Sequence, residues 1–304
     1  MNGFLVVDKP AGMTSHDVVA AARRMLKQKK IGHTGTLDPF ATGVLPLALG
    51  EATKAIPFLD ESEKQYRARM CLGISTDTQD GTGTILRRRE YAGITKEKVV
   101  EVFSRIKGTS FQTPPMYSAI KKGGVPLYKM ARRGEEVERT AREITVHAIT
   151  IESIELPFIT FMVSCSRGTY VRTLASDLGE TLDCGAHLCE LRRLKSGPFT
   201  LENAVSPDML RIPGDGETSD TRLLSPYDAL SHLKDLVLTA RGAQKVGHGI
   251  APGKDDFADF SPVDPGSGQK VRLSFEGRLL AVAAANPADD SDTMKTVCLL
   301  RVFS

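Results

Sequence analysis

The chain has 304 residues, of which 41% are hydrophobic and 25% are charged, and its formal net charge is +3. This length predicts one large domain with a small one, or two of moderate size, and the composition is ordinary for a soluble globular protein. No apolar stretch approaches the roughly 20 residues that a membrane-spanning helix needs, so the sequence excludes a helical membrane protein.

The first part of the chain predicts short strands that alternate with amphipathic helices. Apolar residues at 18, 19, 22, 25 and 26 share one face of a helix that we expect Ser15 to cap. Thr95 is expected to cap a second helix that ends near residue 106, and Asp80-Gly81 marks a turn. The other expected elements here are strands at residues 4–8, 44–49 and 66–72 and a short helix at residues 51–59.

Residues 112–143, here called the excursion, differ in composition from the segments on either side. Prolines, several glycines and seven cationic side chains predict a surface segment rather than core. Beyond it we expect a hairpin of two strands at residues 144–166, a helix at residues 171–182 and a strand at residues 188–199.

The last part of the chain predicts a separate module. Residues 208–221 are rich in glycine, proline and serine and predict a linker. Short β-runs follow at residues 236–238, 271–275, 279–284 and 297–303, typical of a small β-barrel of about 75 residues. We therefore expect an α+β domain at residues 1–228 and a β-barrel module at residues 229–304.

Basic side chains gather in three runs, all in the larger domain. A single run is usually a solvated face, but three together favour a phosphate-rich partner. Residues 225–304, by contrast, carry nine Lys or Arg against ten Asp or Glu. The runs consist of Arg23, Arg24, Lys27, Lys29 and Lys30; of Lys121, Lys122, Lys129, Arg132, Arg133, Arg139 and Arg142; and of Arg192, Arg193 and Lys195.

The cysteines indicate a reducing environment. Their number is odd and their contexts are mainly apolar, which argues against a disulfide framework. The apolar run at residues 4–7 is too short for a secretory signal, so we expect a cytoplasmic protein. Cys184, His187 and Cys189 offer at most three ligands without a second pair, and we expect no metal there. The five cysteines are Cys71, Cys165, Cys184, Cys189 and Cys298.

An isolated acidic side chain, Asp38, lies in a stretch rich in Gly, Thr and Pro at residues 32–54. No second carboxylate lies within ten residues on either side of it. Pro39 restricts the backbone at Asp38, and glycines at 32, 35 and 43 allow another group to approach closely. An isolated carboxylate on so constrained a loop suggests a nucleophile or base. An ordinary Asp-Pro turn is the alternative interpretation.

This loop resembles the signature loop of the TruB family of pseudouridine synthases, in which the matching Asp is catalytic. Segments 8–12, 64–68, 167–174 and 191–199 extend the similarity to about residues 1–200. The matching positions in the loop are His33, Gly35, Leu37, Asp38, Pro39, Ala41, Thr42, Gly43, Leu45, Gly50, Glu51, Ala52, Thr53 and Lys54.

The resemblance implies a pseudouridine synthase domain with a mixed, largely antiparallel sheet and a C-terminal PUA-like RNA-binding module. It also implies isomerisation of uridine to pseudouridine in the TΨC loop of tRNA, at position 55. That reaction replaces the bond from N1 of uracil to the ribose by a bond from C5 of the same base. It involves no redox change and no external group, so no cofactor is expected. The base must be flipped out of the RNA before it can react.

The resemblance assigns Asp38, Tyr66 and Arg172 to catalysis. Arg172 would pair with Asp38, and an opposite charge within about 4–6 Å lowers a carboxyl pKa by about 1–3 units. Tyr66 would stack on the uracil and is the best candidate to accept the C5 proton. Without the resemblance, Tyr66 would be interpreted as an ordinary strand aromatic. The implied substrate-binding residues are His33, Tyr66, Tyr170, Leu191, Lys9 and Lys54.

The excursion resembles the insertion with which stand-alone bacterial members hold the RNA stem-loop. We expect its four grip cations to contact the RNA backbone, and we expect a monomer that needs neither a guide RNA nor a protein partner. An RNA chaperone that folds tRNA is the alternative; an aspartate-based hydrolase is disfavoured because no paired acid or hydrolase motif is present. The grip cations are Lys121, Lys122, Arg132 and Arg133.

Overall fold

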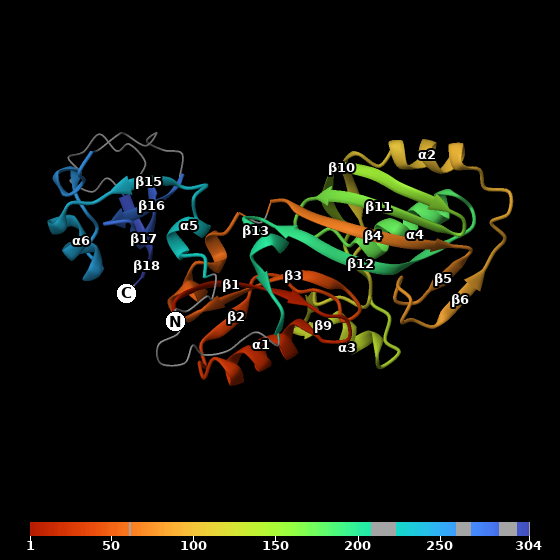
Figure 1. Ribbon diagram of the computed structural model, residues 1–304, viewed down its shortest axis with the longest axis horizontal. Helices are drawn as coiled ribbons and strands as arrows, with labels where there is room; N and C mark the ends of the chain where they lie inside the picture. Colours follow the sequence, from red (N-terminus) through yellow and green to blue (C-terminus); the bar gives the residue numbers. More distant parts are fainter. Residues whose placement is uncertain (61, 208–222, 260–268, 286–296, 304) are drawn as a thin grey trace.

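A ten-stranded mixed sheet forms the larger part of the molecule, and a four-stranded sheet lies at one end of it (Figure 1). The computed structural model describes residues 1–304 except 61, 208–222, 260–268, 286–296 and 304. Helices pack against a sheet that is mostly antiparallel, so the predicted α+β class is confirmed.

The large sheet gathers strands that lie far apart in the sequence. In spatial order they are β14 (Ala204–Val205), β1 (Gly3–Lys9), β3 (Thr42–Leu49), β12 (Ala186–Ser196), β4 (Lys64–Leu72), β11 (Phe158–Cys165), β10 (Arg142–Glu155) and β7 (Gly108–Gln112). Two further strands join at the side, β13 (Phe199–Thr200) beside β12 and β2 (Ile31–His33) beside β3. The expected hairpin at residues 144–166 is β10 and β11.

Three amphipathic helices bury their apolar stripes in the main core. They are α1 (Ser15–Met25), α2 (Lys96–Ser104) and α4 (Val171–Thr181). Side chains alternate along β4, so Tyr66 and Met70 join this core while Arg67 on the other face is exposed. The large sheet therefore has one covered face and one face that is partly open to solvent.

Two central strands bring the Asp38 loop next to the second half of the sheet. The loop connects β2 to β3, and β3 pairs in parallel with β12 through Arg193 and Gly43. Gly43 has a φ of 100°, and a Cβ there would lie 2.1 Å from the carbonyl oxygen of Arg193. Only glycine permits this approach, which fixes the start of β3 against β12.

The first helix begins differently from the prediction. Thr14, not Ser15, is its N-cap, because the Thr14 side chain accepts a hydrogen bond from Asp17 N and the Asp17 carboxylate accepts one from Thr14 N. Ser15 instead donates to Leu37 O and accepts from Leu37 N, so it ties α1 to the Asp38 loop. The prediction that Thr95 caps α2 is confirmed.

Two other expected elements are broken into shorter pieces. The helix expected at residues 51–59 is a pair of 3₁₀ turns, η1 (Gly50–Lys54) and η2 (Ile56–Phe58), because Pro57 cannot continue the first turn. The strand expected at 188–199 ends at Ser196, where Gly197 adopts a φ of 56° and turns the chain into β13. The linker predicted at 208–221 lies outside the described residues.

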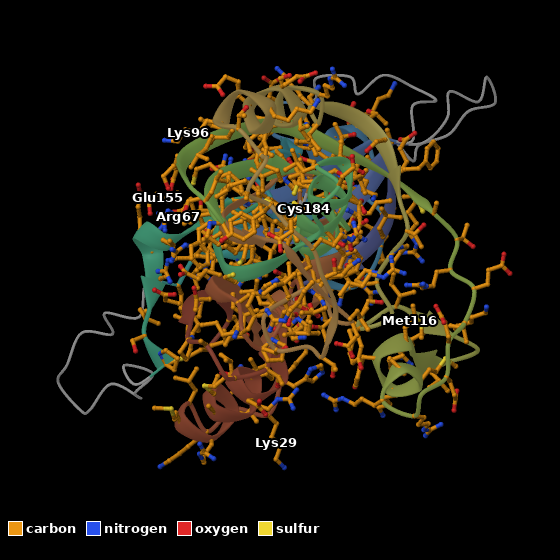
Figure 2. All side chains as sticks on the ribbon, turned by 90° about the vertical axis from the view of Figure 1, so that its right-hand side faces the viewer. Lys29, Arg67, Lys96, Met116, Glu155 and Cys184 are labelled. Atoms are coloured by element: carbon orange, nitrogen blue, oxygen red, sulfur yellow. The ribbon has the colours of Figure 1, made fainter. Side chains whose placement is uncertain are left out.

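The excursion contains regular structure that the sequence did not predict. A small hairpin of β8 (Lys121–Lys122) and β9 (Val125–Pro126) leads into the short helix α3 (Leu127–Ala131). Leu127 is buried, but more than half of the residues in the excursion are exposed, so the prediction of a surface segment is confirmed. Figures 1 and 2 place the excursion on the same side of the molecule as α1. A second hairpin, β5 (Ile74–Thr76) and β6 (Ile85–Arg88), lies beyond β4.

The expected C-terminal module is present as a four-stranded sheet. Its strands are β15 (Lys234–Val237), β16 (Lys270–Phe275), β17 (Arg278–Ala285) and β18 (Val297–Val302), with α6 (Ala240–Gly247) packed against them. The short helix α5 (Pro226–Ala229) belongs to a second apolar cluster that joins both sheets through Phe4, Phe199 and Val282. The PUA-like identity and the boundary at residues 228 and 229 stay predictions. No helix within the described ranges has the length and apolar character to cross a membrane.

Candidate active site

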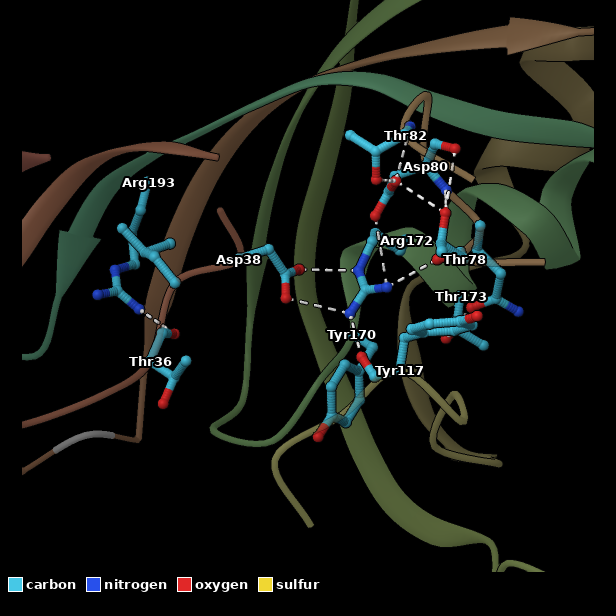
Figure 3. A network of polar contacts seen from close by, with 12 residues as sticks. Thr36, Asp38, Thr78, Asp80, Thr82, Tyr117, Tyr170, Arg172, Thr173 and Arg193 are labelled. Carbon is cyan, nitrogen blue, oxygen red and sulfur yellow. Dashed lines mark hydrogen bonds and ion pairs between the residues drawn. The ribbon is translucent and has the colours of Figure 1, made fainter. Parts of the chain in front are cut away.

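Arg172 and Asp38 form a two-point ion pair at the centre of the larger domain (Figure 3). Arg172 Nε lies 2.8 Å from Asp38 Oδ2, and Nη2 donates to Oδ1 at 3.1 Å. The two residues are 134 positions apart, since Asp38 follows β2 and Arg172 stands in the first turn of α4. The predicted pairing is confirmed, and its fork geometry is one that only a guanidinium provides.

Backbone carbonyls hold the rest of the guanidinium. Nη1 donates to Thr78 O at 2.7 Å, and Nη2 donates to Tyr117 O at 2.9 Å. The side chain of Arg172 is only 3% exposed, so its orientation is set entirely by protein groups. Tyr117 belongs to the excursion, which therefore contributes directly to the arrangement around Asp38.

A second buried acid, Asp80, faces Arg172 from the other side, and the sequence reasoning missed it. Asp80 Oδ2 lies 3.5 Å from Arg172 Nη1, and the side chain is 6% exposed. Its Oδ1 accepts hydrogen bonds from Thr78 Oγ1, Thr82 Oγ1 and Thr82 N. Asp80 was interpreted only as a turn residue; the alternating Thr78-x-Asp80-x-Thr82 pattern was the available signal for a fixed carboxylate. Asp38 is thus isolated in sequence but not in space.

The pKa of Asp38 moves opposite to the prediction. Burial of the carboxyl is the largest effect and raises its pKa, and the negative charge of Asp80 raises it further. Arg172 and Lys9 act in the other direction. About a third of the Asp38 side chain remains exposed, so the carboxyl faces an opening while most of its surroundings are protein.

Lys9, predicted to bind substrate, is instead part of the support of the Asp38 loop. It has no exposed surface, and its Nζ donates to three carbonyl oxygens, those of Pro10, Met13 and Pro39. Burial lowers the pKa of Lys9 to about 8, against the opposing effect of Asp38. A buried amine with three backbone acceptors is not available for direct contact with a ligand.

Arg193 supports the same loop from β12 and was also missed as a site residue. It is fully buried, and its guanidinium donates to Val44 O, Thr36 O and Gly35 O at 2.7, 3.3 and 3.0 Å. The sequence placed it in a basic run, where a surface role is the usual interpretation. Its burial could not be seen without the parallel contact between β3 and β12.

Tyr66 and Tyr170 lie near enough to Asp38 for its negative charge to raise the pKa of both phenols. Tyr66 on β4 is 7% exposed, and burial raises its pKa to about 12, with Arg193 opposing that shift. Tyr170 is the N-cap residue of α4, and burial raises its pKa. Leu191 on β12 is buried in the main core. Both phenols are protonated at neutral pH.

His33 ends β2, just before the Asp38 loop, and Lys54 lies in η1, just after β3 in the sequence. His33 contacts His16 edge to face with ring centroids 5.3 Å apart, and burial lowers the pKa of His33. Lys54 pairs with Glu51 and donates to Val302 O at 3.2 Å, so its ammonium binds the C-terminal module. A direct role of Lys54 in binding substrate stays a prediction.

The four grip cations are exposed on β8 and at the end of α3. Lys122 donates to Glu138 O, and Arg132 lies over the ring of Tyr128 at 5.5 Å from its centroid. Lys29, in the segment between α1 and β2, lies on the same side of the molecule as the excursion, whereas Lys96 lies on the opposite side (Figure 2). Two of the three basic runs, the one that contains Lys29 and the one in the excursion, therefore lie on the same side of the molecule.

The arrangement suits acid–base or nucleophilic chemistry by a single carboxylate. Arg172 favours the ionised form of Asp38, and aromatic and aliphatic side chains surround it. In the described part of the chain, no group of three or more His, Cys, Asp or Glu side chains is placed to hold a metal ion.

Comparisons with known proteins agree with this geometry. Residues 23–171 match the model of the TruB family pseudouridylate synthase N-terminal domain, and residues 172–230 match that of the tRNA pseudouridylate synthase B C-terminal domain. The chain is 55% identical to the tRNA pseudouridine synthase B of Geotalea uraniireducens over 100% of this chain and 98% of that protein. It is 53% identical to the protein of that name from Geobacter sulfurreducens, with 100% of both chains covered.

Solved structures extend the likeness to the whole fold. A chain in the crystal structure of a Cbf5-Nop10-Gar1 complex has a TM-score of 0.76 and 28% identity, covering 99% of this chain and 85% of that one. A chain in an H/ACA RNP bound to a substrate RNA containing 2'-deoxyuridine has a TM-score of 0.74 and 26% identity, covering 99% and 85%. The matches to its family models and the similarity to full-length relatives show that this chain belongs to the TruB family of pseudouridine synthases.

Proposed function

We propose that this protein isomerises uridine to pseudouridine in tRNA, with Asp38 as the catalytic carboxylate. The observation that carries this proposal is the ion pair between the partly exposed Asp38 and the buried Arg172. The reaction breaks the N1–C1′ bond, turns the freed uracil and joins C5 to C1′, with loss of the C5 proton. All atoms of the product come from the substrate, apart from the exchanged proton.

The ionised carboxylate is the form that Asp38 needs in each of three routes. It can attack C1′, add to the base or take the C2′ proton, and all three require the negative charge. Arg172 opposes the effect of burial on the pKa and holds both carboxylate oxygens in place. Asp80 and the carbonyls of Thr78 and Tyr117 hold Arg172 in turn.

Tyr66, Tyr170 and Leu191 are proposed to retain the flipped uracil. A phenol with a pKa of about 12 stays neutral, so Tyr66 stacks on the base as an uncharged ring. If Tyr66 accepts the C5 proton, it must release its own phenol proton in the same step. His33 is proposed to occupy the space that the flipped nucleotide leaves in the RNA.

The TΨC loop at position 55 is the proposed target, and the excursion is the proposed grip on its stem. Exposed cations on β8 and at the end of α3 complement the negative charge of an RNA backbone, and the basic run at residues 23–30 adds further cations on the same side. We propose that the chain acts in the cytoplasm as a monomer without a guide RNA, because the excursion supplies its own RNA contacts. The C-terminal module is proposed to be a PUA-like domain.

Release of tritium from tRNA labelled at C5 of uridine tests this function. The wild-type protein alone should release tritium from one position of an unmodified transcript, and mapping should find pseudouridine at position 55. Asp38→Asn should reduce release to background, whereas Glu152→Gln, which removes an exposed acid on the far face, should leave it unchanged. Undiminished release by Asp38→Asn would refute the assignment. Refolding of tRNA by the inactive Asp38→Asn protein separates a chaperone role from catalysis.

A further inference from the structure

A pair of thiols with a histidine lies on the sheet face opposite the candidate site. Cys71 on β4 points away from the face that carries Tyr66, and its direct cross-strand partner on β12 is His187. Cys189 is the extra residue of a β-bulge, because the register shifts between Leu188 and Glu190. The bulge brings Cys189 to the same face as Cys71.

His187 is oriented as a proton acceptor for Cys189. Its Nδ1 lies 3.0 Å from Ile74 O, and a carbonyl oxygen can only accept, so Nδ1 carries the proton. Nε2 therefore presents its lone pair, and it lies 3.7 Å from Cys189 Sγ. Nothing in the proposed isomerisation uses this contact.

The two thiols also interact with each other. A hydrogen bond from Cys189 lowers the pKa of Cys71 to about 7, and Arg69 nearby acts in the same direction. The same interaction raises the pKa of Cys189, so Cys71 ionises before Cys189. Cys189 is partly exposed and Cys71 is 8% exposed, which leaves the pair open to a molecule as small as a peroxide.

We propose that Cys71, Cys189 and His187 form a peroxide-sensitive dithiol that closes to a reversible disulfide. The Cys71 thiolate attacks hydrogen peroxide: an S–O bond forms, the O–O bond breaks, and the leaving hydroxide becomes water by taking up the proton that Cys71 released to solvent on ionising. Cys189 then attacks the Cys71 sulfur while His187 Nε2 accepts its proton. An S–S bond forms, the S–O bond breaks, and the hydroxide leaves as water with that proton. Two thiols lose two electrons in total, and one peroxide becomes two waters.

The disulfide is positioned to change the site on the other face. Leu188, next to Cys189, donates its N–H to Gln79 O at 3.0 Å and accepts from Gly81 N at 2.8 Å. These bonds hold the turn that carries Asp80, whose carboxylate faces Arg172. A disulfide pulls the bulge toward β4, so it moves the Asp80 turn and lowers activity. This functional consequence depends on the proposed function, whereas disulfide formation does not.

Treatment of the full chain with stoichiometric hydrogen peroxide, followed by mass spectrometry, tests the chemistry. The expected product has lost two hydrogens, contains one peptide link between Cys71 and Cys189, and returns to the starting mass with dithiothreitol. Cys71→Ser and Cys189→Ser should each abolish this intramolecular link. His187→Phe should slow its formation at least tenfold, and Cys298→Ser, which removes an exposed thiol of the other module, should change nothing.

Tritium release from tRNA before oxidation, after oxidation and after reduction tests the consequence. Oxidation should lower the rate of tritium release several-fold, and dithiothreitol should restore it. Cys189→Ser should prevent this loss. A link through Cys298 alone, or no link, would overturn the dithiol. A formed disulfide with unchanged release would overturn its effect on the site. Absence of release from the reduced wild type would count against the proposed function and leave the chemical result standing.

Discussion

Substitution of Arg172 by lysine separates the fork geometry from the positive charge. The guanidinium makes two contacts with Asp38, one each with Thr78 O and Tyr117 O, and one with Asp80. An ammonium has three N–H groups, so Arg172→Lys must give up at least two of these contacts.

The expected loss follows from the strength of those contacts. Hydrogen bonds to charged groups contribute about 1.5–3 kcal/mol each, so two lost contacts correspond to about 3–6 kcal/mol. If the contacts are needed in the transition state, at about 1.4 kcal/mol per factor of ten, the rate should fall roughly a hundredfold to ten-thousandfold. The assay is the first-order rate of tritium release with enzyme in excess over tRNA, together with thermal unfolding of each variant.

Arg192→Lys is the matched control. Two guanidinium nitrogens of Arg192 likewise donate to the carboxylate of Asp8. Both of these side chains, however, are more than a third exposed. Exposed pairs contribute at most about 1 kcal/mol, so this variant should stay within a few-fold of wild type. A rate for Arg172→Lys within threefold of wild type, in a folded protein, would show that charge alone is sufficient and refute the reasoning.

Two further predictions concern pH and salt. Burial raises the pKa of Asp38 above its ordinary value of 3.8, so on acidification the rate of tritium release should begin to fall at a pH above 3.8. Asp80→Asn removes a negative charge that raises this pKa, so in that variant the acidic limb of the pH–rate profile should move to lower pH. A limb at or below 3.8 in wild type, or an upward move in Asp80→Asn, would contradict the assigned cause. Replacing the four grip cations by alanine should reduce the slope of log affinity for tRNA against log salt by about 3, at about 0.7–0.9 per phosphate contact. Alanine at Lys96 and Lys98 on α2 is the control, and an unchanged slope in the quadruple variant would place the RNA contacts elsewhere.

The local sequence was sufficient for the elements and for the identity of the main acid. Apolar spacing predicted α1 and α4 because a helix buries one stripe, the cap at Thr95 predicted α2, and the isolated Asp38 in a Gly- and Pro-rich loop marked the site. Local signals were less reliable at element ends. Thr14 and Ser15 are both good caps by residue type, and only the contact of Ser15 with Leu37 decided between them.

The tertiary structure alone decided how the charges are arranged. Lys9, Asp80 and Arg193 are polar residues that sequence patterns place on surfaces or in turns, yet all three are buried around the Asp38 loop. Lys9 and Arg193 donate to backbone oxygens of the Asp38 loop, among them those of Pro39, Thr36 and Gly35, and backbone groups carry no sequence signature. Asp80 is held by Thr78 and Thr82 and pairs with the distant Arg172. The predicted direction of the pKa shift of Asp38 was wrong for a related reason. Desolvation depends on how much protein surrounds a group, not on which residues flank it in the chain.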